Sequence, residues 1–367
     1  MKVMHIVGAR PNFMKVAPVM EEMARRGGFE QCLVHTGQHY DAQLSTVFFD
    51  ELALPRPDIH LNIGGGSHAE QTGRMMIELE KVFRSKEPAL VVVVGDVNST
   101  LAASVTAAKL GIQIAHVEAG LRSFDRSMPE EINRIVTDAL SDLLFTTEQS
   151  GNENLLREGI PPERIFFVGN VMIDTLLKSR KQAKSSNILE RLQMRPAAYA
   201  VLTLHRPSNV DQPERLQTIL RVLTQVARQL PVVFPCHPRT WQRLQSLDLP
   251  QHISPHGEEQ KCGLILQQPL GYLDFLCLMS QAQFVLTDSG GIQEETTILG
   301  VPCLTLRENT ERPVTLLEGT NTLVGTSEER IVSEVSKIFA GQGKHGQIPA
   351  LWDGQAATRI VEVLSRL

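Results

Sequence analysis

The chain has 367 residues, which is too long for one ordinary hydrophobic core and suits two α/β domains. Its net charge is -5 and its basic residues are scattered among acids, so no nucleic-acid partner is expected. The five cysteines include no CxxC pair, which argues against a disulfide framework or a cysteine-rich zinc site. The first residues lack the long apolar region of a signal peptide, and no apolar stretch approaches the roughly 18 residues of a membrane span. We therefore expect no signal peptide, a cytoplasmic protein and no membrane partner.

Short apolar runs alternate with helical patterns in the first half of the chain, as in a doubly wound parallel sheet. The expected strands are residues 3–7, 31–35, 90–94, 112–117, 143–146 and 165–168. The run 90–94 is wholly apolar, which is typical of a strand buried on both faces. The polar, helical segment 177–196 then carries a run of basic residues, and we interpret it as the junction between domains.

A second series of strands and helices follows the junction. Its expected strands are residues 199–204, 232–235, 284–287 and 301–306. The segment 288–291, Asp-Ser-Gly-Gly, lies between a strand and a helix predicted over 292–299, which Gly300 ends. An amphipathic helix is predicted over 356–367. The two series together predict an α/β protein with two doubly wound domains.

Ligands of open parallel sheets bind beyond the carboxyl ends of the strands, so the residues that follow each strand are the candidate site. In the first half these are Gly8, Arg10, Pro11, Lys15, Gly95, Asp96, Glu118, Arg122, Glu130 and Glu131. In the second half they are His205, Arg206, His237, Arg239, Ser289, Gly290, Gly291, Glu294 and Glu295. The cations and the glycine-rich helix start suggest a diphosphate, and the carboxylates suggest proton transfer.

Each of these residues has a structural alternative. Asp96 could be a helix N-cap, and the acids at 130 and 131 favour the first turn of a helix. Glu118 is either a surface residue at a strand end or a buried functional carboxylate, and we favour the latter. His205 and His237 taken singly are more often structural. No HExxH or HxH spacing predicts a metal site, and the first glycine turn is not GxGxxG, so no metal and no dinucleotide cofactor are expected.

Motifs in order along the chain resemble the non-hydrolysing UDP-N-acetylglucosamine 2-epimerases. They are GARP at 8–11 with Lys15, TGQH at 36–39, GD at 95–96, HVEAGLR at 116–122, PEEINR at 129–134, GN at 169–170, HR at 205–206, TDSGGIQEE at 287–295 and ERP at 311–313. HVEAGLR and the DSGGIQEE stretch are the most specific of these. The resemblance covers nearly the whole chain.

The resemblance implies a GT-B-like fold, two Rossmann-like domains flanking a central cleft, in a homodimer. The expected boundaries are an N-terminal domain at 1–172 that carries the catalytic carboxylates and a UDP-binding domain at 173–353. The helix at 354–367 is expected to pack back on the N-terminal domain.

The resemblance also implies a reaction that needs no cofactor. A base removes the C2 proton of a UDP-N-acetyl amino sugar while UDP leaves C1, giving a 2-acetamidoglucal that is reprotonated on its other face. The product of UDP-N-acetylglucosamine is UDP-N-acetylmannosamine, a precursor of surface polysaccharides. The implied catalytic residues are Asp96, Glu118, Glu130 and His205. The implied substrate contacts are Arg10, Lys15, Glu131, Arg134, His237, Leu270, Tyr272, Phe275, Ser289, Gly290, Gly291, Glu295 and Arg312.

The sequence departs from the pattern of many bacterial members. Asn12 stands where they have glutamate, Pro207 and Ser208 replace an Arg-Glu pair, and Val314 replaces a glutamate. Asp41 occupies the place of a glutamine that contacts an allosteric substrate molecule in some members. Members that act on UDP-2,3-diacetamido sugars or their uronic acids resemble this variant pattern. The sequence is also compatible with a hydrolysing epimerase, a UDP-sugar glycosyltransferase or a non-catalytic nucleotide-sugar sensor.

Overall fold

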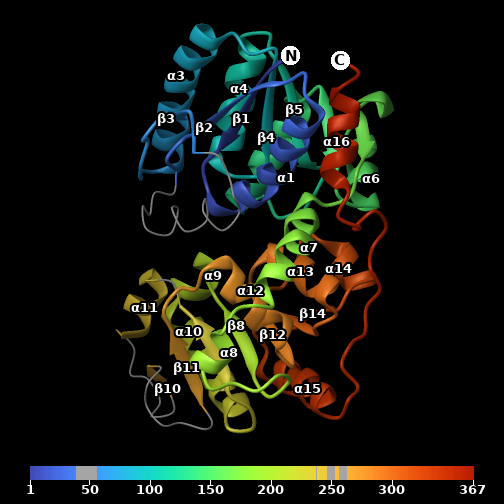
Figure 1. Cartoon of the computed structure of the whole chain (residues 1–367). Coiled ribbons are helices and arrows are strands. Elements are labelled where there is room, and N and C mark those ends of the chain that lie inside the picture. The colour runs from blue at the N-terminus through green and yellow to red at the C-terminus, as the bar shows by residue number, and fades with distance from the viewer. Residues whose placement is uncertain (39–55, 237, 246–252, 256–262) are drawn as a thin grey trace. The chain divides into compact units, whose positions relative to one another are not determined.

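In the computed structural model, the described residues are 1–38, 56–236, 238–245, 253–255 and 263–367. They form two compact units: unit 1 comprises Met1–Lys178 and Ala350–Leu367, and unit 2 comprises Ser179–Pro349 (Figure 1). Each unit has its own parallel sheet with helices, which confirms the predicted α/β class with two doubly wound sheets. No helix in the described part of the chain is both long and apolar enough to cross a membrane.

Unit 1 is built on a seven-stranded sheet in the order β3-β2-β1-β4-β5-β6-β7, and every adjacent pair is parallel. The strands are β1 (Lys2–Val7), β2 (Glu30–His35), β3 (Ile59–His60), β4 (Leu90–Val94), β5 (Gln113–Ala119), β6 (Leu143–Thr146) and β7 (Ile165–Phe167). The strand order reverses between β1 and β4, so the carboxyl ends of these two strands mark the usual ligand position of an open α/β sheet.

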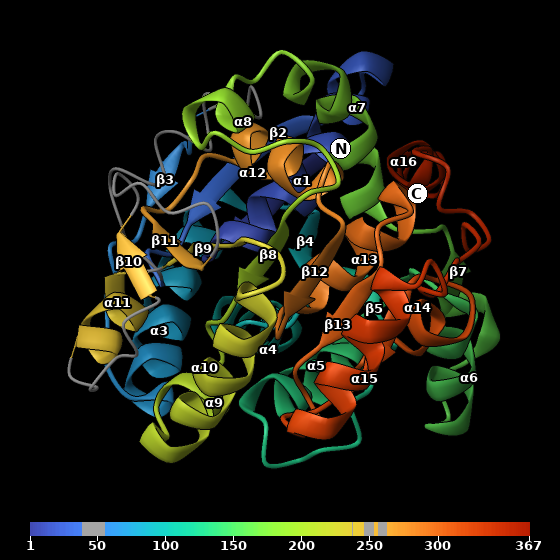
Figure 2. The same cartoon turned by 90° about the horizontal axis from the view of Figure 1, so that it is seen from below.

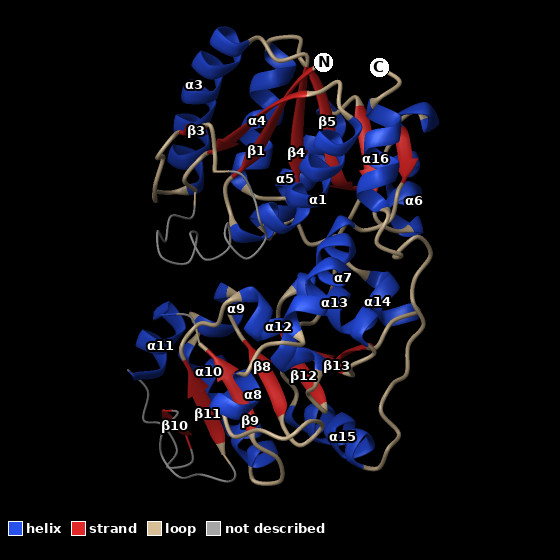
Figure 3. Ribbon diagram, viewed as in Figure 1, coloured by secondary structure: helices blue, strands red, loops and turns tan. Residues whose placement is uncertain are grey.

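Helices link the strands of unit 1 and cover its sheet (Figure 3). They are α1 (Arg10–Arg26), α3 (His68–Lys86), α4 (Asn98–Lys109), α5 (Pro129–Leu140), α6 (Gln149–Arg157), the 3-10 helix η1 (Pro162–Arg164) and α7 (Val171–Ala183). Helix α4 is rich in alanine and is mostly buried between α3 and α5. Its small side chains allow these helices to pack closely on β1 and β4, where Met4, Ile6, Val91 and Val93 form the core.

The end of the chain returns to unit 1. Helix α16 (Ala356–Leu364) packs against α1, as Figure 1 shows. The carboxylate of Asp174 accepts hydrogen bonds from the backbone N–H groups of Ala356 and Ala357 at 3.1 and 2.7 Å, and so caps α16. The Trp352 indole donates to the Thr147 carbonyl at 2.8 Å. The division after Lys178 falls inside α7, a few residues beyond the boundary expected at 172.

Unit 2 has a second seven-stranded parallel sheet, in the order β10-β11-β9-β8-β12-β13-β14. The strands are β8 (Ala200–Thr203), β9 (Val232–Pro235), β10 (Ile253–Pro255), β11 (Leu264–Gln267), β12 (Phe284–Thr287), β13 (Cys303–Thr305) and β14 (Asn321–Leu323). The order reverses between β8 and β12, so the ends of these strands are the second candidate ligand position.

The helices of unit 2 surround this sheet. They are α8 (Ile188–Arg191), α9 (Pro207–Val210), α10 (Pro213–Ala227), α11 (Pro238–Gln245), α12 (Tyr272–Ser280), α13 (Gly290–Leu299), α14 (Pro313–Leu317) and α15 (Glu328–Phe339). Helix α10 packs beside α9 and α15 (Figure 2). Alternate residues of the sheet, such as Leu202, Phe234 and Leu286, share one core with α10 and α15.

The structure extends the predicted strand list. Four strands were not predicted: β3, β10, β11 and β14. β3 has two residues, and β10 and β14 have three each, too few for a pattern of alternating polarity to be visible. The strand expected to end at 117 continues through Ala119, with a shift in its register between Val117 and Ala119. This irregularity surrounds Glu118.

Candidate active site

Asn12 ties together the two strand ends at the reversal point of unit 1. Its Oδ1 accepts hydrogen bonds from the backbone N–H groups of Gly8 and Ala9, at 3.1 and 2.9 Å. Its Nδ2 donates to the carbonyl of Val94 at the end of β4, at 2.9 Å. The turn leaves no room for a side chain at Gly8, because an added Cβ would lie 1.9 Å from the Oγ of Ser99. Asn12, noted in the sequence only as a departure, thus has a clear structural role.

Two predicted site cations lie on α1. Arg10 is its first residue, and the side chain of Arg10 lies outside the described residues. Lys15 is buried, and its Nζ lies 2.6 Å from the Oε2 of Glu118. Both side chains of this ion pair are almost fully excluded from solvent. The structure therefore brings Lys15 and Glu118 together in a buried ion pair.

Glu118 has an unusual backbone conformation. Its φ is +74°, in the left-handed region that residues other than glycine rarely adopt. The strand register shifts at this point, and Gly120 follows with φ +80°. An added Cβ at Gly120 would lie 2.4 Å from the carbonyl oxygen of Gly151, so this turn requires glycine. Strained conformations of this kind cost about 1–3 kcal/mol and cluster at functional sites. The alternative of an ordinary surface acid does not fit Glu118.

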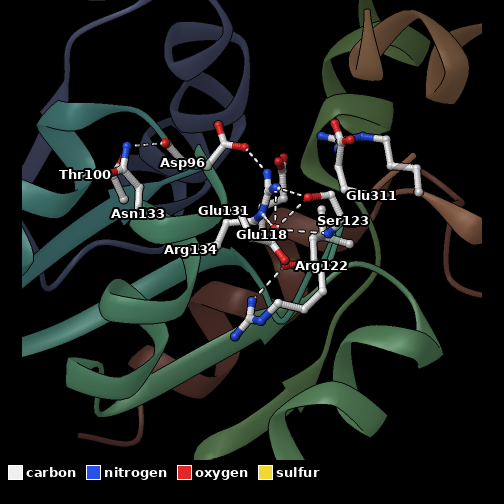
Figure 4. Close-up of polar contacts among 12 residues, drawn as sticks. Asp96, Thr100, Glu118, Arg122, Ser123, Glu131, Asn133, Arg134 and Glu311 are labelled. Atoms are coloured by element: carbon white, nitrogen blue, oxygen red, sulfur yellow. Dashed lines mark hydrogen bonds and ion pairs between the residues drawn. The ribbon is translucent and has the colours of Figure 1, made fainter. Parts of the chain in front are cut away.

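Asp96 follows the neighbouring strand and lies against Arg134 (Figure 4). Val94 pairs with Val117 in the sheet, so Asp96, which follows β4, and Glu118, the penultimate residue of β5, lie at adjacent strand ends. The Nη1 of Arg134 lies 2.5 Å from the Oδ2 of Asp96, whose side chain is 24% exposed. Asp96 is therefore accessible while its carboxylate is held in place by a buried guanidinium.

Arg134 and Glu131 support this arrangement from α5. The guanidinium of Arg134 donates to Glu131 Oε2 from Nε at 2.9 Å and from Nη2 at 2.6 Å. Glu131 also accepts hydrogen bonds from the backbone N–H groups of Ser123 and Phe124. Burial raises the pKa of Glu131, but the Ser123 N–H and Arg134 outweigh it and leave the pKa below its usual value. Both residues were predicted to contact substrate, and the structure gives them buried supporting contacts within unit 1.

Glu130 differs from its neighbour in exposure. It is half-buried in the first turn of α5, whereas Glu131 is almost fully buried. Adjacent residues of a helix point in directions about 100° apart, so only one of the two acids can hold the loop at 123–124. The other, Glu130, remains accessible, as the predicted catalytic role requires.

The reversal point of unit 2 places His205 beside Asp288. The Nδ1 of His205 lies 2.8 Å from Asp288 Oδ1, and the His205 side chain is 54% exposed. Asp288 is fully buried and also accepts hydrogen bonds from the backbone N–H groups of His205 and Arg206. Burial raises the pKa of Asp288, but His205 and these donors outweigh it and lower the pKa. The carboxylate fixes one nitrogen of an imidazole whose other nitrogen is available for chemistry.

Helix α13 begins at Gly290, two residues after Asp288, with Ser289 as its N-cap. Gly290 and Gly291 form its first turn, where backbone N–H groups lack helical partners. An added Cβ at Gly290 would lie 2.7 Å from the Oε1 of Glu311 and 3.1 Å from the Cζ of Arg312. The helix start therefore rests on these two charged side chains, and a side chain at position 290 would displace them. Such a start is suited to an anion.

A buried network of ion pairs lies beneath this helix start. Glu311 contacts Arg312 at 2.9 Å, Arg307 at 2.8 Å and Arg206 at 3.5 Å, and Arg312 also contacts Glu294 at 2.7 Å. Burial raises the pKa of Glu311, but the three arginines outweigh it and hold the pKa well below its usual value. Arg312, predicted to contact UDP, is buried and makes its described contacts with these acids.

Glu295 and Tyr272 form another buried pair in unit 2. The Tyr272 hydroxyl donates to the Oε1 of Glu295 at 3.0 Å. Burial raises the pKa of Glu295 to about 7, and Glu294 nearby adds to the rise while the Tyr272 hydrogen bond opposes it. Leu270, which precedes α12, is buried, and Phe275, which lies on α12, is half-buried.

His237, which was predicted to contact the substrate, lies outside the described residues. Within the ranges that the structure describes, no three His, Cys, Asp or Glu side chains are grouped so that they could hold a metal ion. Sequence reasoning missed the roles of Asn12 and Asp288. The available signal for Asp288 was its position at the end of an apolar strand before Ser289.

Comparison with known proteins places this arrangement in context. Residues 21–365 match the sequence model of a family described as UDP-N-acetylglucosamine 2-epimerase. A protein of Methanocaldococcus jannaschii with that name is 43% identical, over 100% of this chain and 99% of its own length. A UDP-2,3-diacetamido-2,3-dideoxy-D-glucuronate 2-epimerase of Pseudomonas aeruginosa is 40% identical over the full length of both chains.

Solved structures of UDP-GlcNAc 2-epimerases also match this chain. The crystal structure of Methanocaldococcus jannaschii UDP-GlcNAc 2-epimerase in complex with UDP-GlcNAc and UDP matches with a TM-score of 0.91 and 42% identity. The UDP-GlcNAc 2-epimerase from Neisseria meningitidis, bound to UDP-GlcNAc, matches with a TM-score of 0.88 and 30% identity. Both matches cover 100% of each chain, which confirms the predicted GT-B-like class of fold.

Proposed function

Because this chain belongs to the UDP-N-acetylglucosamine 2-epimerase family, we propose that it interconverts UDP-N-acetylglucosamine and UDP-N-acetylmannosamine. The observation that carries the proposal is Glu118, a buried carboxylate in a left-handed backbone conformation, paired with Lys15. Asp96 follows the adjacent strand and is partly accessible. Two carboxylates at neighbouring strand ends provide an acid and a base for opposite faces of a sugar.

In the proposed reaction, a carboxylate of unit 1 takes the C2 proton. The electron pair of the C2–H bond forms a C1=C2 double bond, and the C1–O bond breaks with its electrons on the oxygen of UDP. In the return step UDP attacks C1, and C2 receives a proton on the opposite face. Glu118, Asp96 and Glu130 are the proposed groups that move these protons. Each step conserves atoms and electrons, so the reaction needs no oxidant.

The leaving diphosphate requires positive charge that becomes more effective as the bond breaks. The start of α13 supplies backbone N–H groups without helical partners at Gly290 and Gly291, next to Ser289, and we assign the diphosphate to it. His205 is the proposed donor to the departing oxygen, since Asp288 holds its Nδ1. Arg10 is the proposed counter-charge from unit 1. For Arg312 we propose support of the helix start, on the evidence of its burial beneath Gly290.

A second candidate is the C2 epimerisation of UDP-2,3-diacetamido-2,3-dideoxy-glucuronate. It is favoured by the 40% identity to the Pseudomonas aeruginosa enzyme of that name over the full length of both chains. The reaction at C2 is the same, and only the substituents at C3 and C5 differ. The acid–base groups proposed above therefore serve either substrate.

Proton and phosphorus NMR of the enzyme with each UDP-sugar tests the proposal. UDP-N-acetylglucosamine should give a second UDP-sugar with the manno configuration. Release of free N-acetylmannosamine and UDP would show a hydrolysing enzyme, and turnover of the diacetamido uronate alone would establish the second candidate. If neither UDP-sugar changes although the protein binds UDP, the protein would be a non-catalytic nucleotide-sugar sensor. The proposed homodimer is tested by light scattering, and a role in polysaccharide precursor supply by deleting the gene.

A further inference from the structure

We infer that His116 and Asp138 are positioning residues that fix the two turns carrying Asp96 and Glu118. This inference rests on the function proposed above. The Nδ1 of His116 lies 2.6 Å from Asp138 Oδ1, and its Nε2 lies 2.9 Å from the carbonyl oxygen of Gly95. Both side chains are completely or almost completely buried. The imidazole thus connects a carboxylate of α5 to the residue that precedes Asp96.

Asp138 reaches the other turn directly. Its Oδ2 accepts a hydrogen bond from the backbone N–H of Gly120 at 3.1 Å and lies 2.7 Å from the Nη1 of Arg122. Gly120 is two residues beyond Glu118. One carboxylate is therefore attached to the Glu118 turn through Gly120 and to the Asp96 turn through His116.

The backbone of both turns needs such support. Gly95, Glu118 and Gly120 all have positive φ, at +70°, +74° and +80°. For a residue such as glutamate this conformation is unfavourable and persists only when its surroundings hold it in place. The hydrogen bonds of His116 and Asp138 reach Gly95 and Gly120 themselves, and Gly120 is two residues beyond Glu118. A carboxylate displaced by about 1 Å from its reacting atom loses on the order of 10²-fold in rate.

Both ring nitrogens of His116 face hydrogen-bond acceptors, the carboxylate of Asp138 on one side and the carbonyl oxygen of Gly95 on the other. Burial raises the pKa of Asp138, but His116 and Arg122 outweigh it and lower the pKa, so this carboxylate is ionised. The imidazole ring is therefore oriented by one buried partner at each nitrogen.

Two substitutions of His116 test its contact with Asp138 and its contact with Gly95 separately. An asparagine amide overlays the Nδ1 side of histidine and keeps a donor toward Asp138, while a glutamine amide overlays the Nε2 side and keeps one toward Gly95. His116→Asn and His116→Gln should each lower kcat by 10- to 100-fold while KM and UDP affinity change less than threefold. Asp138→Asn, which weakens both links, should lower kcat at least as much as either.

The matched control is His5→Gln. His5 is also fully buried in the same sheet, on β1, where its Nε2 contacts Gln31 at 3.0 Å. It is not bonded to either turn, so its substitution should cost similar stability and leave kcat of the folded enzyme unchanged. A kcat for His116→Asn and His116→Gln equal to that of His5→Gln would overturn the inference.

A spectroscopic measurement decides the case even if the variants do not fold. With histidine labelled with 15N, NMR of the wild-type protein should show a ring N–H of His116 that exchanges slowly with solvent, because both ring nitrogens are buried against their partners. A ring N–H that exchanges as fast as that of an exposed histidine would overturn the inference. If the wild-type enzyme binds UDP but turns over no UDP-sugar, the proposed function fails, and the ring N–H signal still tests the pairing. If it turns over normally and the variants do too, only the positioning role fails.

Discussion

The buried charges of the two units are used differently. In unit 1, the charged cluster leaves Asp96 and Glu130 partly accessible at the edge of the sheet. In unit 2, the cluster of Glu294, Glu311 and Arg312 is buried beneath the first turn of α13. One cluster presents carboxylates, and the other presents a helix start with its backbone N–H groups.

This difference predicts different costs of mutation. A group that transfers protons need not contribute to stability and can even be strained, as Glu118 is. A buried ion-pair network has to remain complete, because removing one member leaves an uncompensated charge. We therefore expect substitutions in unit 1 to reduce turnover more than stability, and substitutions in the unit 2 network to reduce stability first.

The largest effect is expected for Glu118→Gln. Glutamine keeps the shape and can accept a hydrogen bond from Lys15, but it cannot transfer a proton. Turnover should fall 10²- to 10⁴-fold, the usual range for loss of general acid–base catalysis. UDP affinity by calorimetry and the thermal midpoint should change little. The control is Glu21→Gln, which removes an exposed acid paired with Lys178, and should keep full turnover. Normal turnover of a folded Glu118→Gln would refute the catalytic role.

The next effect is expected in unit 2. Glu311→Gln leaves the guanidinium groups of Arg206, Arg307 and Arg312 without their common acid. Loss of one partner of a buried ion pair costs about 3–5 kcal/mol in the free energy of unfolding. Denaturant titration measures this cost. Glu308→Gln, an exposed acid 3.9 Å from Arg215, should change stability by less than about 0.5 kcal/mol. Equal stabilities for the two variants would contradict the description of the network.

A smaller effect depends on pH. Burial raises the pKa of Glu295 to about 7, above its value in the unfolded chain, so the fold favours the protonated acid. Between these two pKa values the folded protein binds more protons than the unfolded one, and stability falls as pH rises. Glu295→Gln should therefore be more stable than wild type by on the order of 3 kcal/mol above pH 7, with the difference vanishing at acidic pH. A difference independent of pH would refute this assignment.

The smallest effect tests backbone strain in the loop that Glu131 holds. Phe124 has φ +57° and is 70% exposed. Glycine adopts this conformation freely, whereas alanine pays the same steric cost as phenylalanine. Phe124→Gly should exceed Phe124→Ala in free energy of unfolding by about 1 kcal/mol. The reverse order would show that the surrounding contacts do not impose this conformation.

Much of the fold could be predicted from the sequence because buried parallel strands are nearly pure apolar runs. Residues 90–94, 143–146, 232–235 and 284–287 were predicted with the observed bounds. The strand ends in turn located Asp96, Glu118, His205 and Ser289, since ligand groups of such sheets lie there.

The supporting residues could not be predicted in the same way. Asp138 lies inside α5, and only the fold brings its carboxylate to Gly120 and His116. The division of roles between Glu130 and Glu131 depends on the helix rotation relative to the loop at 123–124. The burial of Arg312 beneath Gly290 likewise depends on the packing of two segments that are distant in sequence.

In the proposed reaction, a carboxylate of unit 1 removes the C2 proton of the UDP-sugar. The most direct measurement is proton NMR of UDP-N-acetylglucosamine with the enzyme in D2O. Deuterium should enter C2 during turnover by the wild-type enzyme, and Glu118→Gln, with UDP still bound, should fail to introduce it. Product that keeps protium at C2 through many turnovers, or normal exchange by Glu118→Gln, would contradict this mechanism.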